Sequence, residues 1–174
     1  RERFLIGDAI DRAVKMIRRQ QSRAAETERA GATDDVRGIY VDECYDIGHI
    51  ENAHFWPFGV SYEADNPYCR WVNTNGVAFE LARTDWHYVL NTFCFGYGVG
   101  YKFSKSAHGA ANGNFLGLGA DSCQRAVVVE DAQPPGLLIS NGEFVGRWSS
   151  TDAVCVEIAP GADGKVSLVN CSFW

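Results

Sequence analysis

The sequence repeats one short pattern along most of its length, an asparagine followed three positions later by a phenylalanine. Before each asparagine lies a short β-branched run in which apolar residues alternate with others. Such recurrence is typical of a solenoid, in which each repeat forms one turn and neighbouring turns bury a shared core. The pairs are Asn52 with Phe55, Asn112 with Phe115, Asn141 with Phe144 and Asn170 with Phe173, and Asn91 joins them with Phe93 and Phe95.

The β-branched runs predict the first strand of each turn. They begin at Gly38, Gly76, Gly98, Ala126 and Ala153, and each ends with a charged residue. The asparagines are unevenly spaced, which indicates that loops of different length leave the coil between strands. A stacked side-chain amide can donate to the turn above and accept from the turn below. We therefore expect the asparagines to form a ladder and the phenylalanines to form a column.

With these features the chain resembles the right-handed parallel β-helix proteins of the pectate-lyase-like superfamily, which includes polysaccharide lyases, glycoside hydrolases and phage tail-spike depolymerases. The resemblance covers residues 37–174 and implies an all-β, single-stranded right-handed parallel β-helix of about five rungs. It also implies an extracellular or surface-associated location and a polysaccharide ligand. The ordered motifs of pectate lyases and polygalacturonases are absent from the sequence, which counts against those two activities.

Residues 1–36 form a separate N-terminal segment. Apolar residues recur there at helical spacing and predict an amphipathic helix from about Asp8 to Arg29. The apolar stripe fades after Ile17, which favours a cap over the first rung rather than an interfacial helix that assembles protomers. At the other end, Trp174 lies in the strand of the fifth rung. We expect further rungs or a homo-oligomer to cover the sheet edge there.

Composition excludes several classes of protein. The net charge is −6 and basic residues are not clustered, so a nucleic-acid partner is not expected. No stretch approaches the ~20 apolar residues of a membrane span. The six cysteines contain no Cys-x-x-Cys pair, which counts against a zinc site, and the four histidines have no His-x-x-x-His spacing for a metal. We expect neither a metal nor a cofactor. Most of them should be unbonded, although Cys44 and Cys69 flank a long excursion and could form a disulfide in a secreted protein.

Strand alternation predicts a column of charged side chains on the outer face of the first sheet, consisting of Asp42, Glu80, Lys102, Glu130 and Glu157. Glu80 and Glu130 would bracket Lys102 about 9.6 Å apart, since rungs are separated by ~4.8 Å. That separation is near the upper limit for inverting glycoside hydrolysis. Glu80, Lys102 and Glu130 are therefore the candidate catalytic residues, with the lysine as an alternative lyase base. The alternative is a structural column whose lysine neutralises its neighbours; that lysine also disfavours Ca²⁺.

Aromatic and polar residues gather in residues 59–75, predicted to be a long loop, and in residues 84–88, predicted to be a turn. Flat rings beside polar groups can bind sugar rings, and residues 84–88 could extend the platform that the first segment forms. The same rings can instead pin a loop to the body of the protein. His87 is the candidate for acid–base chemistry. The candidate substrate-binding residues are Tyr62, Tyr68, Arg70, Trp71, Asp85, Trp86 and His87.

Two functions of different class fit the sequence. In the first, the protein is a carbohydrate-active β-helix that binds a polysaccharide on the outer face of one parallel sheet and cleaves it as a hydrolase or a lyase. In the second, it is a non-catalytic structural or adhesive module of a surface fibre or tail spike. A shared groove between residues 59–75 and the charged column is necessary for the first function.

Overall fold

The computed structural model describes residues 37–56, 63 and 65–174. The predicted N-terminal helix lies outside the described residues, and so does Tyr62. Five consecutive coils follow one another along the chain. The first consists of β1 (Arg37–Val41), β2 (Cys44–Glu51) and β3 (His54–Phe55); helix α2 (Pro67–Asn75) then precedes β4 (Val77–Leu81) and β5 (Thr84–Phe95) of the second.

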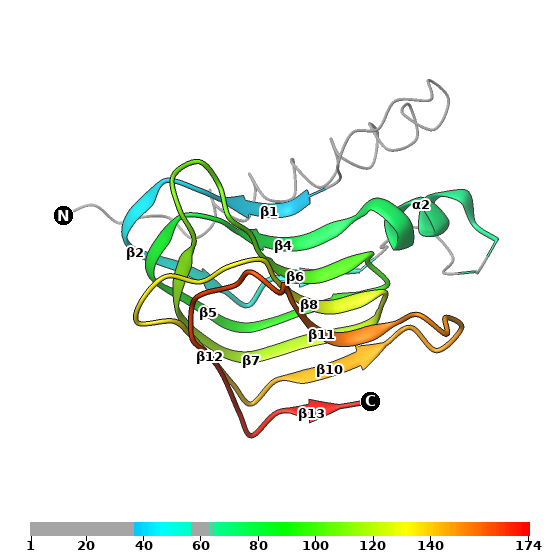
Figure 1. Cartoon of the computed structure of the whole chain (residues 1–174). Coiled ribbons are helices and arrows are strands. Elements are labelled where there is room, and N and C mark those ends of the chain that lie inside the picture. The colour runs from blue at the N-terminus through cyan, green and yellow to red at the C-terminus, as the bar shows by residue number, and fades with distance from the viewer. Residues whose placement is uncertain (1–36, 57–62, 64) are drawn as a thin grey trace.

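The remaining coils have the same order of strands. The third consists of β6 (Val99–Phe103) and β7 (Ala111–Cys123), and the fourth of β8 (Arg125–Val129), β9 (Leu137–Ser140) and β10 (Glu143–Gly146). The fifth consists of β11 (Val154–Ile158), β12 (Val166–Val169) and β13 (Ser172–Phe173). Two parallel sheets result. Sheet A has the order β1-β4-β6-β8-β11, and sheet B contains the eight other strands (Figure 1).

Among the described residues, every strand pair within the two sheets is parallel and joins neighbouring coils. Four turns of the chain separate the first and last of the five strands of sheet A, so this is a parallel β-solenoid of about four turns, and the predicted β-helix is confirmed. Within the described residues, no helix has both the length and the apolar character needed to cross a bilayer.

Stacked apolar side chains fill the coil between the two sheets. The inward column of sheet A consists of Ile39, Phe79, Tyr101, Val127 and Val156, which are partners on successive strands. Sheet B opposes it with Ile50, Val89, Phe115, Ile139 and Leu168. Rings of adjacent coils contact directly: the centroids of Phe79 and Tyr101 lie 4.8 Å apart in a stacked pair. Burial of these columns supplies the main stabilisation of the fold.

The predicted register of the charged column was wrong at two positions. The observed column runs Tyr40, Glu80, Lys102, Val128 and Glu157. Asp42 and Glu130 instead lie two residues further along the chain, immediately after the last residues of β1 and β8. A slip of two residues keeps every side chain on its original face, so the alternation of apolar residues cannot detect it.

A column of left-handed residues bends sheet B along one corner of the coil. Asn52, Asn91, Asn141 and Asn170 have φ between 51° and 55°, and the strand registers on both sides place them on successive coils together with Gly117. Asparagine and glycine adopt this conformation at low cost. The amide of Asn170 donates to that of Asn141 over 2.7 Å, so the predicted ladder is present between these two coils.

Asn112 is not a member of this corner. Its place in the third coil is taken by Gly117, where φ is +67°. Phe115 accordingly lies in the same column as Val89, whereas the column after the corner contains Phe55, Cys94, Ala120, Phe144 and Phe173. The prediction that Asn112 and Phe115 repeat the common pattern was therefore wrong, because thirteen-residue β7 crosses the corner at glycine.

Residues 67–75 are helical, which corrects the predicted long loop over 59–75. Asn66 caps the helix: its side chain accepts hydrogen bonds from the backbone N–H groups of Tyr68 and Cys69. Pro67 follows at the first helical position and Gly76 ends the helix. Asparagine, proline and a closing glycine are standard helix boundaries, so the sequence did contain this signal.

All six cysteines are free in the structure. Cys44 and Cys69 therefore form no disulfide.

At the far end of the solenoid, β11 and β13 are the last strands of their paths in sheets A and B. Ile158 and Phe173 on these strands are each 49% exposed.

Candidate functional site

The three candidate catalytic residues do come together, but in a saturated ion-pair group. Lys102 Nζ lies 2.9 Å from Glu130 Oε1 and 3.6 Å from Glu80 Oε1. Arg37 Nε lies 2.6 Å from the other oxygen of Glu80, whose side chain is only 4% exposed. Lys102 reaches Glu130 diagonally across the strands, since its direct partner is Val128.

The ion pairs shift the pKa values of Lys102 and Glu130 further from neutral pH, which disfavours proton transfer by either group. Burial lowers the pKa of the Lys102 ammonium, but hydrogen bonding to Glu130 and the charge of Glu80 outweigh it and leave that pKa above its ordinary value. Burial likewise raises the pKa of Glu130, yet the hydrogen bonds from Lys102 and the Lys105 backbone hold it below its ordinary value. Near neutral pH, Lys102 is thus held protonated and Glu130 ionised, so neither is in the form that a general base or a general acid needs.

The predicted aromatic platform is divided between opposite ends of the strands of sheet A. Tyr68 and Trp71 are half-buried on α2 and pack against the core, while Arg70 is exposed. Helix α2 precedes β4, whereas Asp85 and Trp86 follow β4 on the next strand (Figure 1). The five residues of β4 separate the two groups by about 16 Å at ~3.3 Å per residue. The expectation of one platform was wrong.

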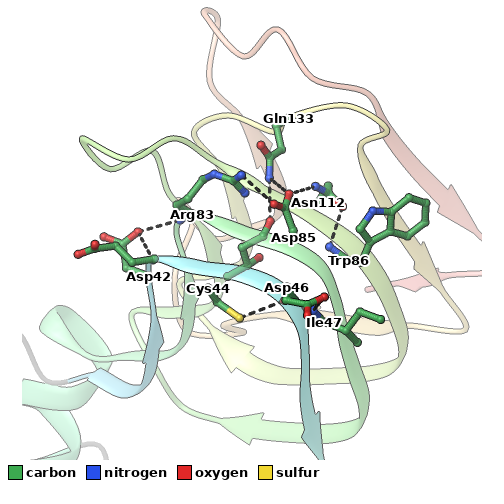
Figure 2. A network of polar contacts seen from close by, with 11 residues as sticks. Asp42, Cys44, Asp46, Ile47, Arg83, Asp85, Trp86, Asn112 and Gln133 are labelled. Carbon is green, nitrogen blue, oxygen red and sulfur yellow. Dashed lines mark hydrogen bonds and ion pairs between the residues drawn. The ribbon is translucent and has the colours of Figure 1, made fainter.

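A polar network at the corner between sheets A and B connects four successive coils. We call Asp42, Arg83, Asp85, Asn112 and Gln133 the corner network (Figure 2). Arg83 Nη2 donates to Asp85 Oδ2 over 2.8 Å. The other oxygen of Asp85 accepts from the amides of Asn112 at 2.9 Å and Gln133 at 2.8 Å. Asp42 accepts from the backbone N–H of Arg83 at 3.0 Å.

Charge and hydrogen bonds make the corner network rigid. The Arg83 guanidinium holds the pKa of the Asp85 carboxyl below its ordinary value, and the amides of Asn112 and Gln133 contribute in the same direction. The Asp42 carboxylate also accepts from Ser106 Oγ at 2.9 Å and from the Tyr40 hydroxyl at 3.1 Å. Networks in which each charge has several partners fix side-chain positions more strongly than single pairs do.

Trp86 leaves the strand at this corner in an unusual backbone conformation. Thr84 pairs with Ala111 and His87 with Gly113, so β5 holds one extra residue and forms a β-bulge. Trp86 has φ of 48°, a left-handed value that is rare for a bulky residue. Its N–H donates to Asn112 Oδ1 over 2.9 Å, and its indole, 53% exposed, points away from the corner network (Figure 2).

Two further apolar side chains are exposed on the neighbouring coil. Tyr45 and Ile47 are both 58% exposed, and Ile47 is the strand partner of Asp85. The guanidinium of Arg83 lies 5.1 Å from the centroid of the Tyr45 ring and so connects it to the corner network. We call Tyr45, Ile47 and Trp86 the Trp86 surface.

His87 was predicted to lie in a surface turn, but it lies inside the coil. It is 3% exposed, and a Cβ on Gly48 of the neighbouring coil would collide with its imidazole. Neither ring nitrogen has a hydrogen-bond partner among the described residues. Burial, with a smaller contribution from His49, lowers the pKa of His87 to about 4. A neutral, enclosed imidazole cannot contact a polysaccharide on the outer surface.

Sequence reasoning singled out Asp85 and Trp86 but not the residues that hold them in the structure. Asn112 was assigned to the ladder, and Tyr45, Arg83 and Gln133 were not singled out. No local pattern relates these positions, which belong to different coils. In the described part of the chain, no group of three or more His, Cys, Asp or Glu residues could hold a metal ion.

Comparisons of the chain with family models, with curated proteins and with solved structures found no match. The β-solenoid fold therefore rests on the strand pairing of the structure alone.

Proposed function

We propose that this β-helix binds a polysaccharide at the Trp86 surface. The observation that carries the proposal is Trp86 itself, a half-exposed indole held at a left-handed bulge. A bulky residue in this conformation costs on the order of 1–3 kcal/mol and persists where the surroundings enforce it, most often at functional sites. Because the corner network enforces it here, we assign the exposed indole a contact function.

The chemistry of the surface suits sugar rings. An indole and a phenol offer flat apolar area to the C–H faces of a sugar, and their polar atoms remain available for hydrogen bonds. Asp46 lies between Tyr45 and Ile47 in the sequence and is exposed, so a carboxylate is available to accept from sugar hydroxyls. The rigid corner network reduces the ordering that binding requires, which favours affinity.

Binding rather than cleavage is the function that we propose for this surface. The ion pairs around Lys102 favour a structural role for Glu80, Lys102 and Glu130, since both pKa shifts oppose proton transfer. Asp85 is likewise fully hydrogen-bonded and its pKa is lowered, so it is unsuited to act as an acid.

The proposal is tested by affinity electrophoresis of the protein in gels that contain neutral and acidic polysaccharides. We expect at least one polymer to retard the native protein, and Trp86→Ala to weaken the retardation about tenfold or more, as loss of a central aromatic contact does. Trp148→Ala is the matched control, because Trp148 is 71% exposed elsewhere on the surface. Equal retardation of the two variants, or none of the native protein, would refute the proposal.

The second candidate function is a structural module that assembles with a second copy. It is favoured by apolar side chains on the last strands of both sheets, where Ile158, Leu168 and Phe173 are 39–49% exposed. Unpaired strand edges with exposed apolar residues favour association. Sedimentation equilibrium of the native chain and of Leu168→Lys tests this: a dimer that the substitution converts to monomer supports assembly, and a native monomer at all concentrations contradicts it.

A further inference from the structure

A second outward surface lies on sheet B, beyond the asparagine corner. We call Trp56, Phe93, Phe95, Asp121 and Glu143 the carboxylate–aromatic face. Phe95 and Asp121 are strand partners, and Phe93 and Glu143 both pair with Gly119. Trp56 stacks on Phe95 with ring centroids 4.1 Å apart and is 37% exposed. Rings and carboxylates therefore occupy neighbouring outward positions on four consecutive coils.

Asp121 is the key residue of this face. Its Oδ1 atom is buried and has no hydrogen-bond partner in the part of the chain that the structure describes. Burial raises the pKa of the Asp121 carboxyl, although a hydrogen bond from the Ser122 backbone opposes the shift. A buried carboxylate oxygen without a donor is unfavourable, and a ligand that supplies a donor or a positive charge would relieve it.

The carboxylates of this face differ from those on sheet A in having no cationic partner. Glu130 is paired with Lys102, and Glu157 with Arg125 at 2.6 Å. No ion pair between described residues involves Asp121 or Glu143. The register places Glu143 one coil and two residues away from Asp121, or about 8 Å between backbones. An exposed carboxylate, Glu143, and a half-buried one, Asp121, thus lie without a cationic partner beside a Trp–Phe stack.

Aromatic rings beside unpaired carboxylates complement an organic cation. A ring attracts a cation through its electron-rich face, and tryptophan does so most strongly. The carboxylates add direct charge attraction and accept N–H hydrogen bonds. Uronic acids would be repelled by the same carboxylates, and the chain as a whole carries a net charge of −6. An amino-sugar polymer combines ammonium groups with apolar ring faces and fits both components of this face.

We propose that the carboxylate–aromatic face binds the ammonium groups of an amino-sugar glycan. In this arrangement Asp121 and Glu143 accept N–H hydrogen bonds from ammonium groups, and Trp56 packs against a sugar ring. This site is separate from the Trp86 surface, and neither depends on the other.

The test is isothermal titration of the native chain with three hexasaccharides: fully deacetylated hexaglucosamine, its N-acetylated counterpart and hexagalacturonate. At about pH 6 the glucosamine amines are protonated and native binding of hexaglucosamine should be tightest, with hexagalacturonate not bound. Asp121→Asn and Trp56→Ala should each weaken hexaglucosamine binding about tenfold, or 1.4 kcal/mol. Asp163→Asn removes one exposed charge elsewhere on the surface and is the control: it should weaken hexaglucosamine binding only by the non-specific effect of one lost negative charge.

The outcomes separate this proposal from the polysaccharide binding assigned to the Trp86 surface. Trp86→Ala should leave hexaglucosamine binding unchanged. If Trp86→Ala instead abolishes hexaglucosamine binding while Trp56→Ala leaves it unchanged, the ammonium groups bind at the Trp86 surface and this proposal is overturned. Equal effects of Asp121→Asn and Asp163→Asn would show only non-specific charge attraction and would also overturn it. Should Asp121→Asn fail to fold, the carboxyl carbon of Asp121 can be followed by NMR in the native chain. Saturation with hexaglucosamine should then lower its pKa, and an unchanged titration would contradict the proposal.

Discussion

Two left-handed residues on the same strand, Trp86 and Asn91, show how differently a β-solenoid can form its corners. Their φ angles are 48° and 51°. At Asn91 every coil supplies an asparagine or a glycine, the residue types that adopt this conformation at low cost. At Trp86 the residue is bulky, the strand contains an extra residue, and side chains from four coils hold the backbone in place.

The comparison separates a structural corner from a candidate contact site. The asparagine corner repeats through the whole solenoid and is needed wherever the chain bends. The bulge at Trp86 is local, and the backbone strain there exposes an indole that a regular strand would place differently. A left-handed conformation that recurs at asparagine or glycine indicates a structural corner, whereas one that is imposed on a bulky residue such as Trp86 indicates a functional site.

The largest expected effect concerns His87, which the bulged corner buries. Its folded pKa of about 4 lies below the ordinary value of 6.5, so the unfolded chain takes up the proton first as the pH falls. The stability contributed by the neutral imidazole is complete above pH 6.5 and is lost between pH 6.5 and 4, by up to about 3 kcal/mol. Urea unfolding at several pH values should show this loss in the native chain but not in His87→Leu. His108→Gln, at an exposed position, should retain the native pH dependence; a native profile in His87→Leu would contradict the prediction.

Gly117 tests the asparagine corner. A Cβ at this position would lie 3.0 Å from Asn91 Oδ1, and φ is +67°. We expect Gly117→Val to lower the free energy of unfolding by about 2 kcal/mol, because a β-branched residue is strained in the left-handed region. Gly117→Asn, which restores the residue type of the other coils, should be tolerated to within about 0.5 kcal/mol. Equal losses in the two variants would show that space, and not backbone conformation, limits this position.

Asn141→Ala should have a smaller effect at the same corner. It removes the 2.7 Å amide hydrogen bond from Asn170 and places alanine at φ of 53°. Together these changes should lower the free energy of unfolding by about 1 kcal/mol. Asn141→Gly removes the same hydrogen bond without the conformational cost, and thermal unfolding of both variants separates the two contributions. A greater loss in the glycine variant than in the alanine variant would contradict a conformational role.

The smallest expected effect is a gain. Trp86→Asn replaces a bulky left-handed residue by one that accepts this conformation, and the indole is already 53% exposed. The free energy of unfolding should therefore rise, by about 0.5–1 kcal/mol, while polysaccharide retardation is lost. A clear loss of stability in Trp86→Asn would place the bulge among structural corners, together with Asn91.

The sequence predicted the fold through its alternation and repeats, and failed where those signals are degenerate. Phe79, Tyr101 and Val127 are fully buried as the alternation predicted. The positions of Asp42 and Glu130 were wrong by two residues, a slip that leaves the alternation unchanged. The helix over 67–75 was missed although Asn66 and Pro67 mark its start, because the expectation of a solenoid loop took precedence over a local boundary signal.

For the candidate site, the sequence indicated Asp85 and Trp86 from composition alone, and it also indicated His87, which proved to be buried. The sequence could not predict that Trp86 is exposed and His87 buried. The bulge that separates them arises from contacts with the next coil, where Asn112, twenty-six residues away, accepts a hydrogen bond from the Trp86 N–H. The platform expected from α2 and residues 84–88 failed for a similar reason, since the two segments lie at opposite ends of one strand.

The amino-acid sequence by itself determined that this chain coils, which side chains face inward, and where left-handed residues are tolerated, because periodicity and residue type act locally in every turn. Only the tertiary structure decided the register between coils, the ion pairs that neutralise Lys102, and the network that exposes Trp86. Those features depend on contacts between residues on different coils, and their energies are set by distances that no local pattern in the chain encodes.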